Sequence, residues 1–314
     1  MPLHTYIVKH NNENIRAESR SGGVFTALSD FIIEQDGIVF GCMLNERFEA
    51  IHSRATTKAE RNSFRGSKYV QSNVGNTFLE AKSDLKDGKL VLYSGTPCQI
   101  AGLKSYLRTE DAVPLVCVDI VCHGVPSPGI WQEYLRYSEK CYKGNVTNVD
   151  FINKKKYGWS AHYETISVNN KEYDSKIWTT LFGKHYILRP ACFQCPYKKV
   201  EHIADITIGD AWGIKQANPE FDDNKGVSLV LINTDKGNSL FEKVKDNLCF
   251  KEVDLQDYMQ PSFVAPYSLP HNRDSFWRCY HKGGFERVVK KYIELGLVRR
   301  AVRKILRTIG IWRE

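Results

Sequence analysis

The sequence predicts an α/β fold: a mixed, largely parallel sheet flanked by helices, with a second, smaller α+β portion and a basic amphipathic C-terminal helix. Three observations lead to this prediction. Short apolar strands alternate with helical patterns through the first 145 residues, the pattern then changes to paired strands, and cationic residues gather at the end of the chain. With 314 residues the chain is long enough to bury a substantial core.

The first portion, residues 1–145, reads as helices that alternate with buried strands. A glycine or proline stands at most of the changes between the two patterns. The elements expected here are a helix over 21–36, a strand over 38–44, a helix over 76–87, a strand over 89–93, a helix from Pro97, a strand over 115–121 and a helix from Pro128 to Leu135.

The second portion, residues 146–280, is expected to be α+β and to carry a Cys-x-x-Cys loop. Its expected elements are paired strands at 149–152 and 163–168, a helix over 177–187, strands at 205–210 and 227–232, and a helix over 237–244. The third portion, residues 281–314, is the basic tail. We expect a soft boundary near residue 145, with one site formed from both sides of it.

The net charge of +8 is concentrated in the tail. Residues 282–314 hold ten Lys/Arg and three Glu, which leaves a charge of about +1 on the rest of the chain. A nucleic-acid-binding domain would carry basic clusters in its body, so we expect no nucleic-acid partner. From Val298 to Trp312 one helical face is apolar and the other is basic, which suits packing on the protein itself, an anionic membrane surface or an acidic partner protein.

The cysteine count favours a reducing compartment. Nine cysteines are an odd number, and the sequence shows neither a secretory signal nor an apolar run of the roughly 18–20 residues that span a membrane. We therefore expect a cytoplasmic protein, peripheral to the membrane at most, whose thiols are free or bind metal.

Four cysteines stand in loops suited to metal binding. Cys98 and Cys122 each follow an expected strand, whereas Cys192 and Cys195 form a Cys-Phe-Gln-Cys-Pro pair far down the chain. Ligands drawn from distant loops favour an iron–sulfur cluster over a local zinc site, although structural zinc and unliganded buried thiols remain alternatives. The remaining cysteines lie within strand or helix patterns and are expected in the core; they are Cys42, Cys117, Cys141, Cys249 and Cys279.

Three polar loops, two of them directly before expected helices, are candidates for holding a dinucleotide pyrophosphate. Backbone amides at a helix start bind phosphate well, although a glycine pair there is as often a simple capping turn. Neither Gly-x-Gly-x-x-Gly nor a Walker motif occurs, so ordinary NAD and ATP sites have no support. The nearby candidate thiolate cluster makes a flavin a better candidate than a nucleoside triphosphate. The candidate residues are Ser21, Gly22 and Gly23 in the first loop, Ser67, Lys68, Tyr69 and Ser72 in the second, and Gly95, Thr96, Pro97 and Gln99 in the third.

Two further features stand close to these loops. His123 adjoins Cys122 and is expected to orient a substrate or to tune the cluster through a hydrogen bond. Asp210 and Trp212 follow the strand at 205–208 and suit a cofactor wall or a turn around a buried indole. Lys68 and His123 are the candidates for side chains that act on the flavin or on the acceptor.

Five motifs in order resemble the coenzyme F420 hydrogenase/dehydrogenase beta subunit family. They are Ser21-Gly-Gly-Val-Phe-Thr, Arg65-Gly-Ser-Lys-Tyr-Val-Gln-Ser, Ser94-Gly-Thr-Pro-Cys-Gln-Ile-Ala-Gly-Leu, Asp119-Ile-Val-Cys-His-Gly-Val-Pro-Ser-Pro and Asp205-Ile-Thr-Ile-Gly-Asp-Ala-Trp-Gly. The resemblance runs from about residue 15 to 215.

The resemblance implies an oxidoreductase with FAD and a [4Fe-4S] cluster that passes electrons to an organic acceptor at the flavin. It makes Cys98, Cys122, Cys192 and Cys195 the cluster ligands, and it implies that the three polar loops line the flavin. The acceptor would be an F420-type deazaflavin or another small molecule, since the family does not fix the substrate.

The sequence departs from the family pattern at its start. Many relatives begin with a ferredoxin-like segment of two cysteine-rich runs, whereas the first cysteine here is Cys42. We therefore expect a separate ferredoxin-like donor or redox subunit, for which the basic tail is a candidate docking element. The rival interpretation is a non-catalytic accessory protein of a polysaccharide or glycan pathway, in which the cysteines hold a structural metal.

Overall fold

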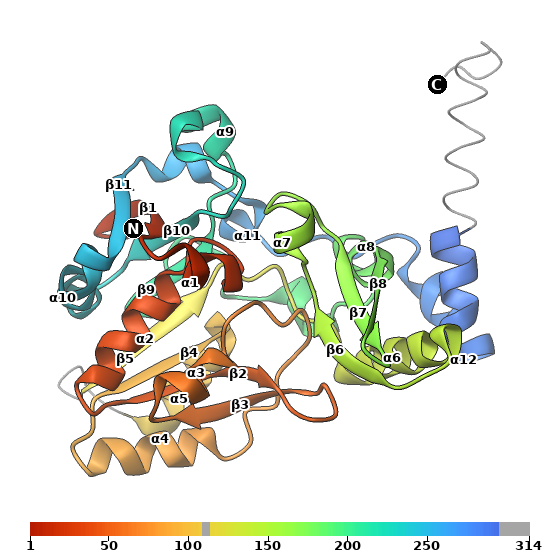
Figure 1. The fold of residues 1–314 in the computed structure, drawn as a ribbon, viewed down its shortest axis with the longest axis horizontal. Helices are drawn as coiled ribbons and strands as arrows, with labels where there is room; N and C mark the ends of the chain where they lie inside the picture. Colours follow the sequence, from red (N-terminus) through yellow and green to blue (C-terminus); the bar gives the residue numbers. More distant parts are fainter. Residues whose placement is uncertain (109–113, 295–314) are drawn as a thin grey trace.

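The computed structural model describes residues 1–108 and 114–294. An eight-stranded sheet and a three-stranded sheet lie side by side, each with its own helices (Figure 1). The strands are β1 (His4–His10), β2 (Ile38–Leu44), β3 (Ala50–Ala55), β4 (Val91–Gly95), β5 (Leu115–Ile120), β6 (Val146–Asp150), β7 (Glu164–Val168), β8 (Lys171–Ser175), β9 (Ile206–Asp210), β10 (Ser228–Ile232) and β11 (Leu248–Glu252).

The helices follow the predicted alternation. The α-helices are α1 (Glu13–Glu18), α2 (Val24–Glu34), α3 (Lys58–Asn62), α4 (Thr77–Lys86), α5 (Pro97–Leu107), α6 (Pro128–Tyr142), α7 (Lys154–Tyr157), α8 (Ile177–Gly183), α9 (Ile214–Ala217), α10 (Asp235–Val244), α11 (Pro261–Val264) and α12 (Arg273–Val288). A 3₁₀ turn, η1 (Pro190–Gln194), carries the start of the Cys-x-x-Cys pair, and a π-helical turn, η5 (Val289–Glu294), follows α12.

The large sheet has the order β11-β1-β10-β9-β5-β4-β2-β3. Its central strands β2, β4, β5 and β9 pair in parallel, and the strands outside them pair antiparallel. The predicted mixed α/β fold with a parallel centre is therefore confirmed. Strands from residues 4–120 and from residues 206–252 share this sheet, so the chain returns to it after forming the small sheet β6-β7-β8. The proposed division near residue 145 stays a prediction.

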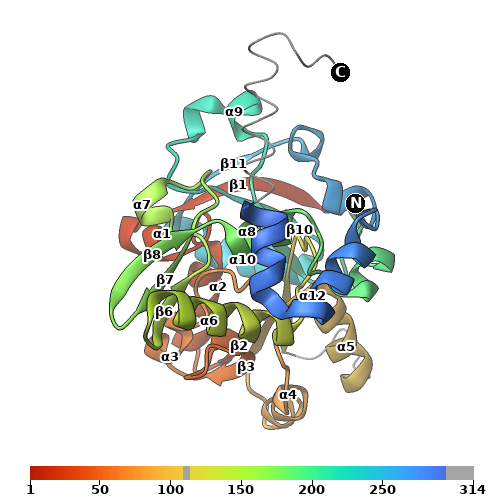
Figure 2. The same ribbon diagram turned by 90° about the vertical axis from the view of Figure 1, so that its right-hand side faces the viewer.

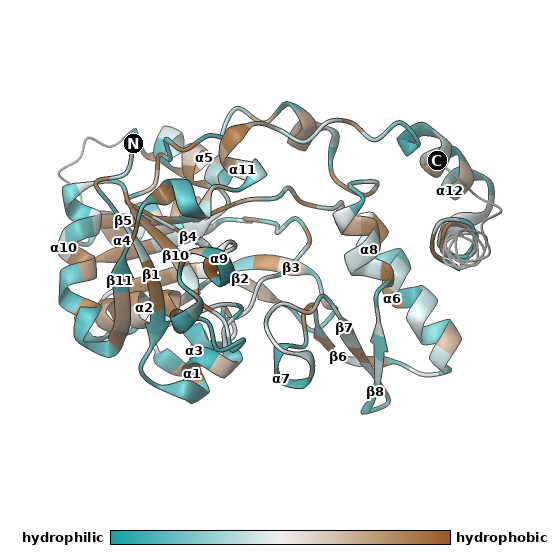
Figure 3. Cartoon of the chain, turned by 90° about the horizontal axis from the view of Figure 1, so that it is seen from above, coloured by the Kyte–Doolittle hydropathy of each residue, from teal (hydrophilic) through white to brown (hydrophobic). Residues whose placement is uncertain are grey.

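Alternate residues of the central strands face two separate cores. Val39, Leu92 and Val116 pack against α2 and α10 on one face, whereas their neighbours in sequence pack against α4 and α5 on the other. The hydropathy colouring of Figure 3 places hydrophobic residues in the central strands and hydrophilic residues on outer helix faces. Burial on both faces explains why these strands read as continuous apolar runs in the sequence.

The small sheet has its own core with α6, α8 and α12, which lie together in Figure 2. Large aromatic side chains fill this core; Trp131, Tyr134 and Trp178 are all almost fully buried. Glu164 of β7 lies among them and accepts hydrogen bonds from the Tyr134 hydroxyl, the Trp178 amide and the Thr179 hydroxyl at 3.2, 2.8 and 2.8 Å. One buried carboxylate thus joins the sheet to two helices.

The predicted amphipathic helix from Val298 to Trp312 lies outside the described residues. None of the helices within the described residues has the length and apolar character that crossing a bilayer requires.

We expect Glu164→Ala to lower the free energy of unfolding by about 2–4 kcal/mol, because it leaves several buried donors without an acceptor. Urea unfolding measures the loss. Glu172→Ala on the exposed strand β8 is the matched control and should stay within about 0.5 kcal/mol of the unsubstituted protein. Equal losses in the two variants would contradict this account of Glu164.

Candidate functional site

A cavity of about 930 Å³ opens at the carboxyl ends of the parallel strands. Gly95, Ile120 and Asp210, the last residues of β4, β5 and β9, all line it. Residues of α8 also line the cavity, so the helix that packs on the small sheet contributes to the site as well. Ligands collect at this edge of an open α/β sheet because the strands end there and the connecting loops diverge.

The loop before α2 forms one wall of this cavity. Gly23 has a positive φ of 91° and begins α2 without a side-chain cap, which leaves the first turn of the helix open toward the cavity. Gly22 packs behind the loop instead. A Cβ atom on Gly22 would lie 2.0 Å from the Val8 carbonyl oxygen and 2.7 Å from the Ser228 amide nitrogen.

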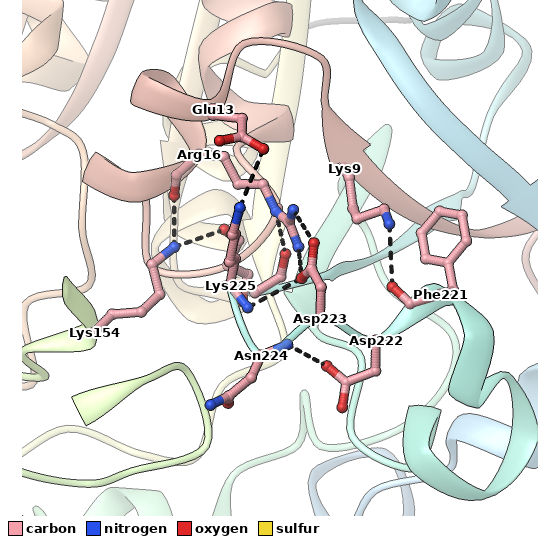
Figure 4. A network of polar contacts seen from close by, with 12 residues as sticks. Lys9, Glu13, Arg16, Lys154, Phe221, Asp222, Asp223, Asn224 and Lys225 are labelled. Atoms are coloured by element: carbon pink, nitrogen blue, oxygen red, sulfur yellow. Dashed lines mark hydrogen bonds and ion pairs between the residues drawn. The ribbon is translucent and has the colours of Figure 1, made fainter. Parts of the chain in front are cut away.

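Buried cations hold the same loop from behind (Figure 4). The Arg16 guanidinium donates to the Gly226 carbonyl at 2.8 Å and to the Asp223 carboxylate at 2.6 Å. Lys154 of α7 donates to the carbonyls of Arg16 and Ser21 at 2.5 and 3.2 Å. Burial, together with the nearby Arg20 and Arg16, lowers the pKa of Lys154 to about 7. These contacts fix the loop to both sheets.

The loop over 65–72 forms a second wall. The Lys68 ammonium donates to the carbonyls of Ser63 and Arg65 at 2.9 and 2.8 Å, and burial lowers its pKa to about 8. The Tyr69 hydroxyl accepts from Arg20 at 3.0 Å. An ammonium that titrates near neutrality and a guanidinium-bound phenol thus face the same cavity.

Ser72 connects this loop to the loop before α5. The Gln99 amide donates to the Ser72 hydroxyl at 2.9 Å, while the Gln99 carbonyl accepts from the Thr96 amide at 2.9 Å. His52 of β3 contacts the same hydroxyl through Nδ1 at 2.9 Å, and its Nε2 lies 3.0 Å from the Ser94 carbonyl oxygen. Burial lowers the pKa of His52 to about 4, so the ring is neutral near pH 7.

A polar and aromatic group closes the end of the cavity beside β9. Asp210 accepts from Ser21 and from the Trp159 indole and pairs with Arg20 at 3.3 Å. The Trp159 and Trp212 rings stack with centroids 4.9 Å apart and an interplanar angle of 6°. Trp212 lines the cavity and presents an aromatic surface to it.

The two cysteine-bearing segments run side by side at the other end. The Arg189 amide donates to the Val125 carbonyl at 3.0 Å, and Pro126 forms an isolated bridge with Leu188. The Val125 amide donates to the Cys192 sulfur at 3.4 Å. We call residues 119–126 and 188–202 together the paired cysteine segments.

Two buried side chains extend this pairing. His202 Nδ1 lies 2.8 Å from Asp119 Oδ2, and both side chains are almost fully buried. The Lys198 ammonium donates to the His123 carbonyl at 2.8 Å. The pairing therefore covers the whole stretch on which Cys122, Cys192 and Cys195 stand.

The segment between α11 and α12 covers the paired cysteine segments. The Tyr267 ring lies 4.4 Å from the His123 ring and 4.2 Å from the His185 ring, measured between centroids. Arg273 donates to the Leu188 carbonyl at 2.9 Å. His123 Nε2 is buried and has no hydrogen-bond partner among the residues that the structure describes.

Cys98 shares the cavity wall with Cys122, whose segment pairs with the one that carries Cys192 and Cys195, but the four thiols do not form a metal site as they stand. Cys98 and Cys122 line the cavity, and the thiols of Cys98 and Cys192 both contribute to the raised pKa of Cys122. Burial is the main cause and raises the pKa of Cys122 to about 12, although a hydrogen bond from the Gly124 amide lowers it. Across residues 1–108 and 114–294, no three His, Cys, Asp or Glu side chains are close enough as they stand to hold a metal ion.

The donor chemistry of this cluster fits a soft metal centre. Its candidate ligands are four sulfur atoms, backbone amides donate to two of them, and the Lys198 ammonium lies nearby. Amide donors and positive charge stabilise thiolates, and thiolate ligands select iron–sulfur clusters or zinc.

A family model that describes the C terminus of the coenzyme F420 hydrogenase/dehydrogenase beta subunit matches residues 88–257, more than half of the chain. The chain belongs to this family. Membership indicates a redox protein of the hydrogenase and dehydrogenase subunit type. No curated protein matches the chain.

A solved structure of the F420-reducing [NiFe] hydrogenase complex from Methanosarcina barkeri, derivatised with xenon, has a similar chain. The two share 19% sequence identity with a TM-score of 0.56, and the match covers 90% of this chain and 94% of that chain. At this identity the likeness shows a shared fold.

Within this F420 hydrogenase/dehydrogenase beta subunit fold, the structure places most of the predicted cofactor residues on the cavity wall. Lys68 and His123 line it too, whereas Gly22 and Pro97 are packed behind it. The lining residues from the three predicted loops are Ser21, Gly23, Ser67, Lys68, Tyr69, Ser72, Gly95, Thr96 and Gln99.

Other cavity residues were missed or misplaced by sequence reasoning. His52 stands on an edge strand that was not predicted, and Tyr267 follows no motif. Lys198, which contacts the His123 carbonyl and is not part of the cavity wall, was missed as well. Cys42 was expected in the core but lines the cavity, and the core prediction was wrong for Cys141 and Cys249, which are exposed. Cys117 and Cys279 are buried as predicted. The spacing of Lys198, three residues after Cys195, was the available signal.

We expect Gly22→Ala to destabilise the protein by at least about 2 kcal/mol, because the added methyl group would overlap the backbone of β1 and β10. Gly183→Ala is the matched control, since a Cβ atom there meets nothing within 4 Å. Denaturant unfolding should find the control unchanged or slightly stabilised. A stable Gly22→Ala protein would show that this glycine is free to serve a ligand instead.

Proposed function

We propose that the chain is an iron–sulfur flavoprotein oxidoreductase that passes electrons between a [4Fe-4S] cluster and FAD, and from there to a small organic acceptor. The observation that carries the proposal is that Cys98 and Cys122 line the same cavity as the open start of α2 and the two other polar loops. A metal centre at those sulfur atoms would adjoin a ligand in the cavity.

In this proposal Cys98, Cys122, Cys192 and Cys195 ligate the cluster. The paired cysteine segments carry three of these residues, and backbone and side-chain hydrogen bonds already join the two segments. Cys98 stands in the first turn of α5, where its Sγ atom lies 3.2 Å from Thr96 Oγ1.

FAD is the proposed occupant of the cavity. The uncapped start of α2 at Gly23 suits the pyrophosphate, because helix N-termini present free amides and positive potential to phosphate. Lys68 and the Ser72–Gln99 pair suit polar groups of the flavin. When bound, a flavin exchanges single electrons with a metal centre and a hydride with an organic acceptor.

The proposed acceptor is an F420-type deazaflavin or another planar organic molecule. The family name supports the first, and the aromatic surface of Trp212 supports stacking of a planar ring. We propose that His123 orients a bound molecule, since its buried Nε2 has no partner in the described residues and its ring lines the cavity.

A separate ferredoxin-like protein or redox subunit is the proposed electron donor. Cys98 is exposed, which offers a short path from a docked partner to the cluster. The related chain belongs to a hydrogenase complex, which supports a redox partner for this chain as well. We propose a cytoplasmic location, and contact of the basic tail with a membrane or a partner; residues 295–314 of that tail lie outside the described residues.

We expect anaerobically purified protein to contain about four irons, four sulfides and one FAD per chain. Cys122→Ser should lose most of the iron, because a serine oxygen replaces a thiolate that is already held in place. Cys249→Ser on the exposed β11 should keep it. Iron, sulfide and flavin analysis measures both. Zinc without flavin would instead support the accessory metal-binding alternative.

We expect FAD affinity to fall as the pH rises from 7 to 9, because the proposed contact of Lys68 with acceptor oxygens of the anionic cofactor needs the protonated ammonium. The pKa of Lys68 is about 8 in the free protein, so above it the protein must take up a proton to bind the anion. The affinity for FAD can fall by at most about tenfold for each pH unit above the pKa. Quenching of FAD fluorescence by apoprotein gives the dissociation constants.

Two variants control this measurement. Lys68→Arg keeps its charge over the whole range and should bind with little pH dependence, whereas Lys68→Gln should bind more weakly at pH 7 and without the slope. The same slope in Lys68→Gln as in the unsubstituted protein would assign the pH dependence to another group.

A further inference from the structure

Lys198 is a buried lysine whose contacts leave its charge uncompensated by carboxylates. Its exposed fraction is 6%, and its ammonium donates to the His123 carbonyl at 2.8 Å. The ammonium also lies 3.8 Å from the centroid of the Tyr267 ring, which covers it from the side of the α11–α12 segment. Among the described residues, no Asp or Glu forms an ion pair with it.

Apart from Tyr267, the titratable neighbours of Lys198 are cysteines and histidines, and of these only the cysteines can become anionic. Burial lowers its pKa, and the groups that oppose this effect are the thiols of Cys122, Cys192 and Cys195. The influence is mutual, since Lys198 lowers the pKa of Cys122 and of Cys192 against the effect of burial. The ammonium thus lies within electrostatic reach of three of the four proposed ligands.

An isolated buried ammonium is costly, and an opposite charge must offset that cost. Carbonyl and ring contacts supply part of the compensation through their dipoles. Thiolates bound to a metal centre would supply a full negative charge where neutral thiols do not. The geometry therefore suits a site that is anionic when it is filled.

We propose that Lys198 is a positioning residue that fixes one positive charge beside the four-cysteine site and thereby raises the reduction potential of the cluster bound there. This inference rests on the proposed function. A cluster held by four thiolates is anionic, and one-electron reduction adds one further negative charge. A neighbouring cation stabilises the reduced form more than the oxidised form, because net charge around a cluster is one of the factors that set its potential.

The hydrogen bond and the charge of Lys198 can be separated by substitution. Lys198→Gln keeps a donor for the His123 carbonyl and removes the charge, whereas Lys198→Arg keeps both. Lys199→Gln is the matched control, because Lys199 is the next residue but its side chain is exposed and screened by water.

The test is a potentiometric titration of each full-length, anaerobically prepared protein with dithionite as the electron source, followed by the electron paramagnetic resonance signal of the reduced cluster. We expect the midpoint potential of Lys198→Gln to shift to a more negative value. Lys198→Arg should stay near the unsubstituted protein, and Lys199→Gln should not move. A loaded Lys198→Gln protein with an unshifted midpoint would overturn the inference.

Variants that fail to load also decide the question. Loss of iron from Lys198→Gln but not from Lys198→Arg, with flavin content and cooperative unfolding retained in both, would support a requirement for the charge. Loss of iron or of folding in both Lys198→Gln and Lys198→Arg, with Lys199→Gln normal, would overturn the inference. The shape of the lysine side chain, and not its charge, would then be what the site requires. An unsubstituted protein that binds no iron would refute the proposed function itself.

Discussion

The pairing of residues 119–126 with residues 188–202 is the constraint on which the site depends. These segments are far apart in sequence, and one ends a strand of the large sheet while the other follows the small sheet. Backbone hydrogen bonds, the His202–Asp119 contact and the Lys198–His123 contact join them. Because the pairing consists of contacts within the protein, the two segments that carry three of the cysteines are already joined before a ligand arrives, which lowers the entropy cost of assembling the site.

The cavity depends on a second set of buried polar contacts. Arg16 and Lys154 hold the loop before α2 from behind, and the Ser72–Gln99 hydrogen bond joins the two other loops. Each buried polar group costs free energy unless it is bonded, so such networks are stable only when the loops keep one arrangement. The result is a rigid wall of open amides and polar side chains, which suits a cofactor that must be held at a fixed distance from a metal centre.

Sequence reasoning predicted the central elements well because strands buried on both faces have continuous apolar runs. It missed the edge strands β3, β8 and β11 and the strand β1 beside β11, whose patterns are short or mixed with polar residues, and with β3 it missed His52. Motif spacing brought out the four cysteines and the polar loops. It did not show that Gly22 serves packing or that Cys42 faces the cavity, since both depend on which chain segments pack nearby. Lys198 was missed although it stands three residues after Cys195, because the sequence does not show that its side chain is buried against the His123 carbonyl.

Crystallography of the anaerobically reconstituted protein, with diffraction data collected on both sides of the iron absorption edge, tests the central claim most directly. The account predicts one compact iron peak bonded to the sulfur atoms of Cys98, Cys122, Cys192 and Cys195, at the end of the cavity beside the paired cysteine segments. An iron-free site, or iron bound to residues outside this set, would contradict it.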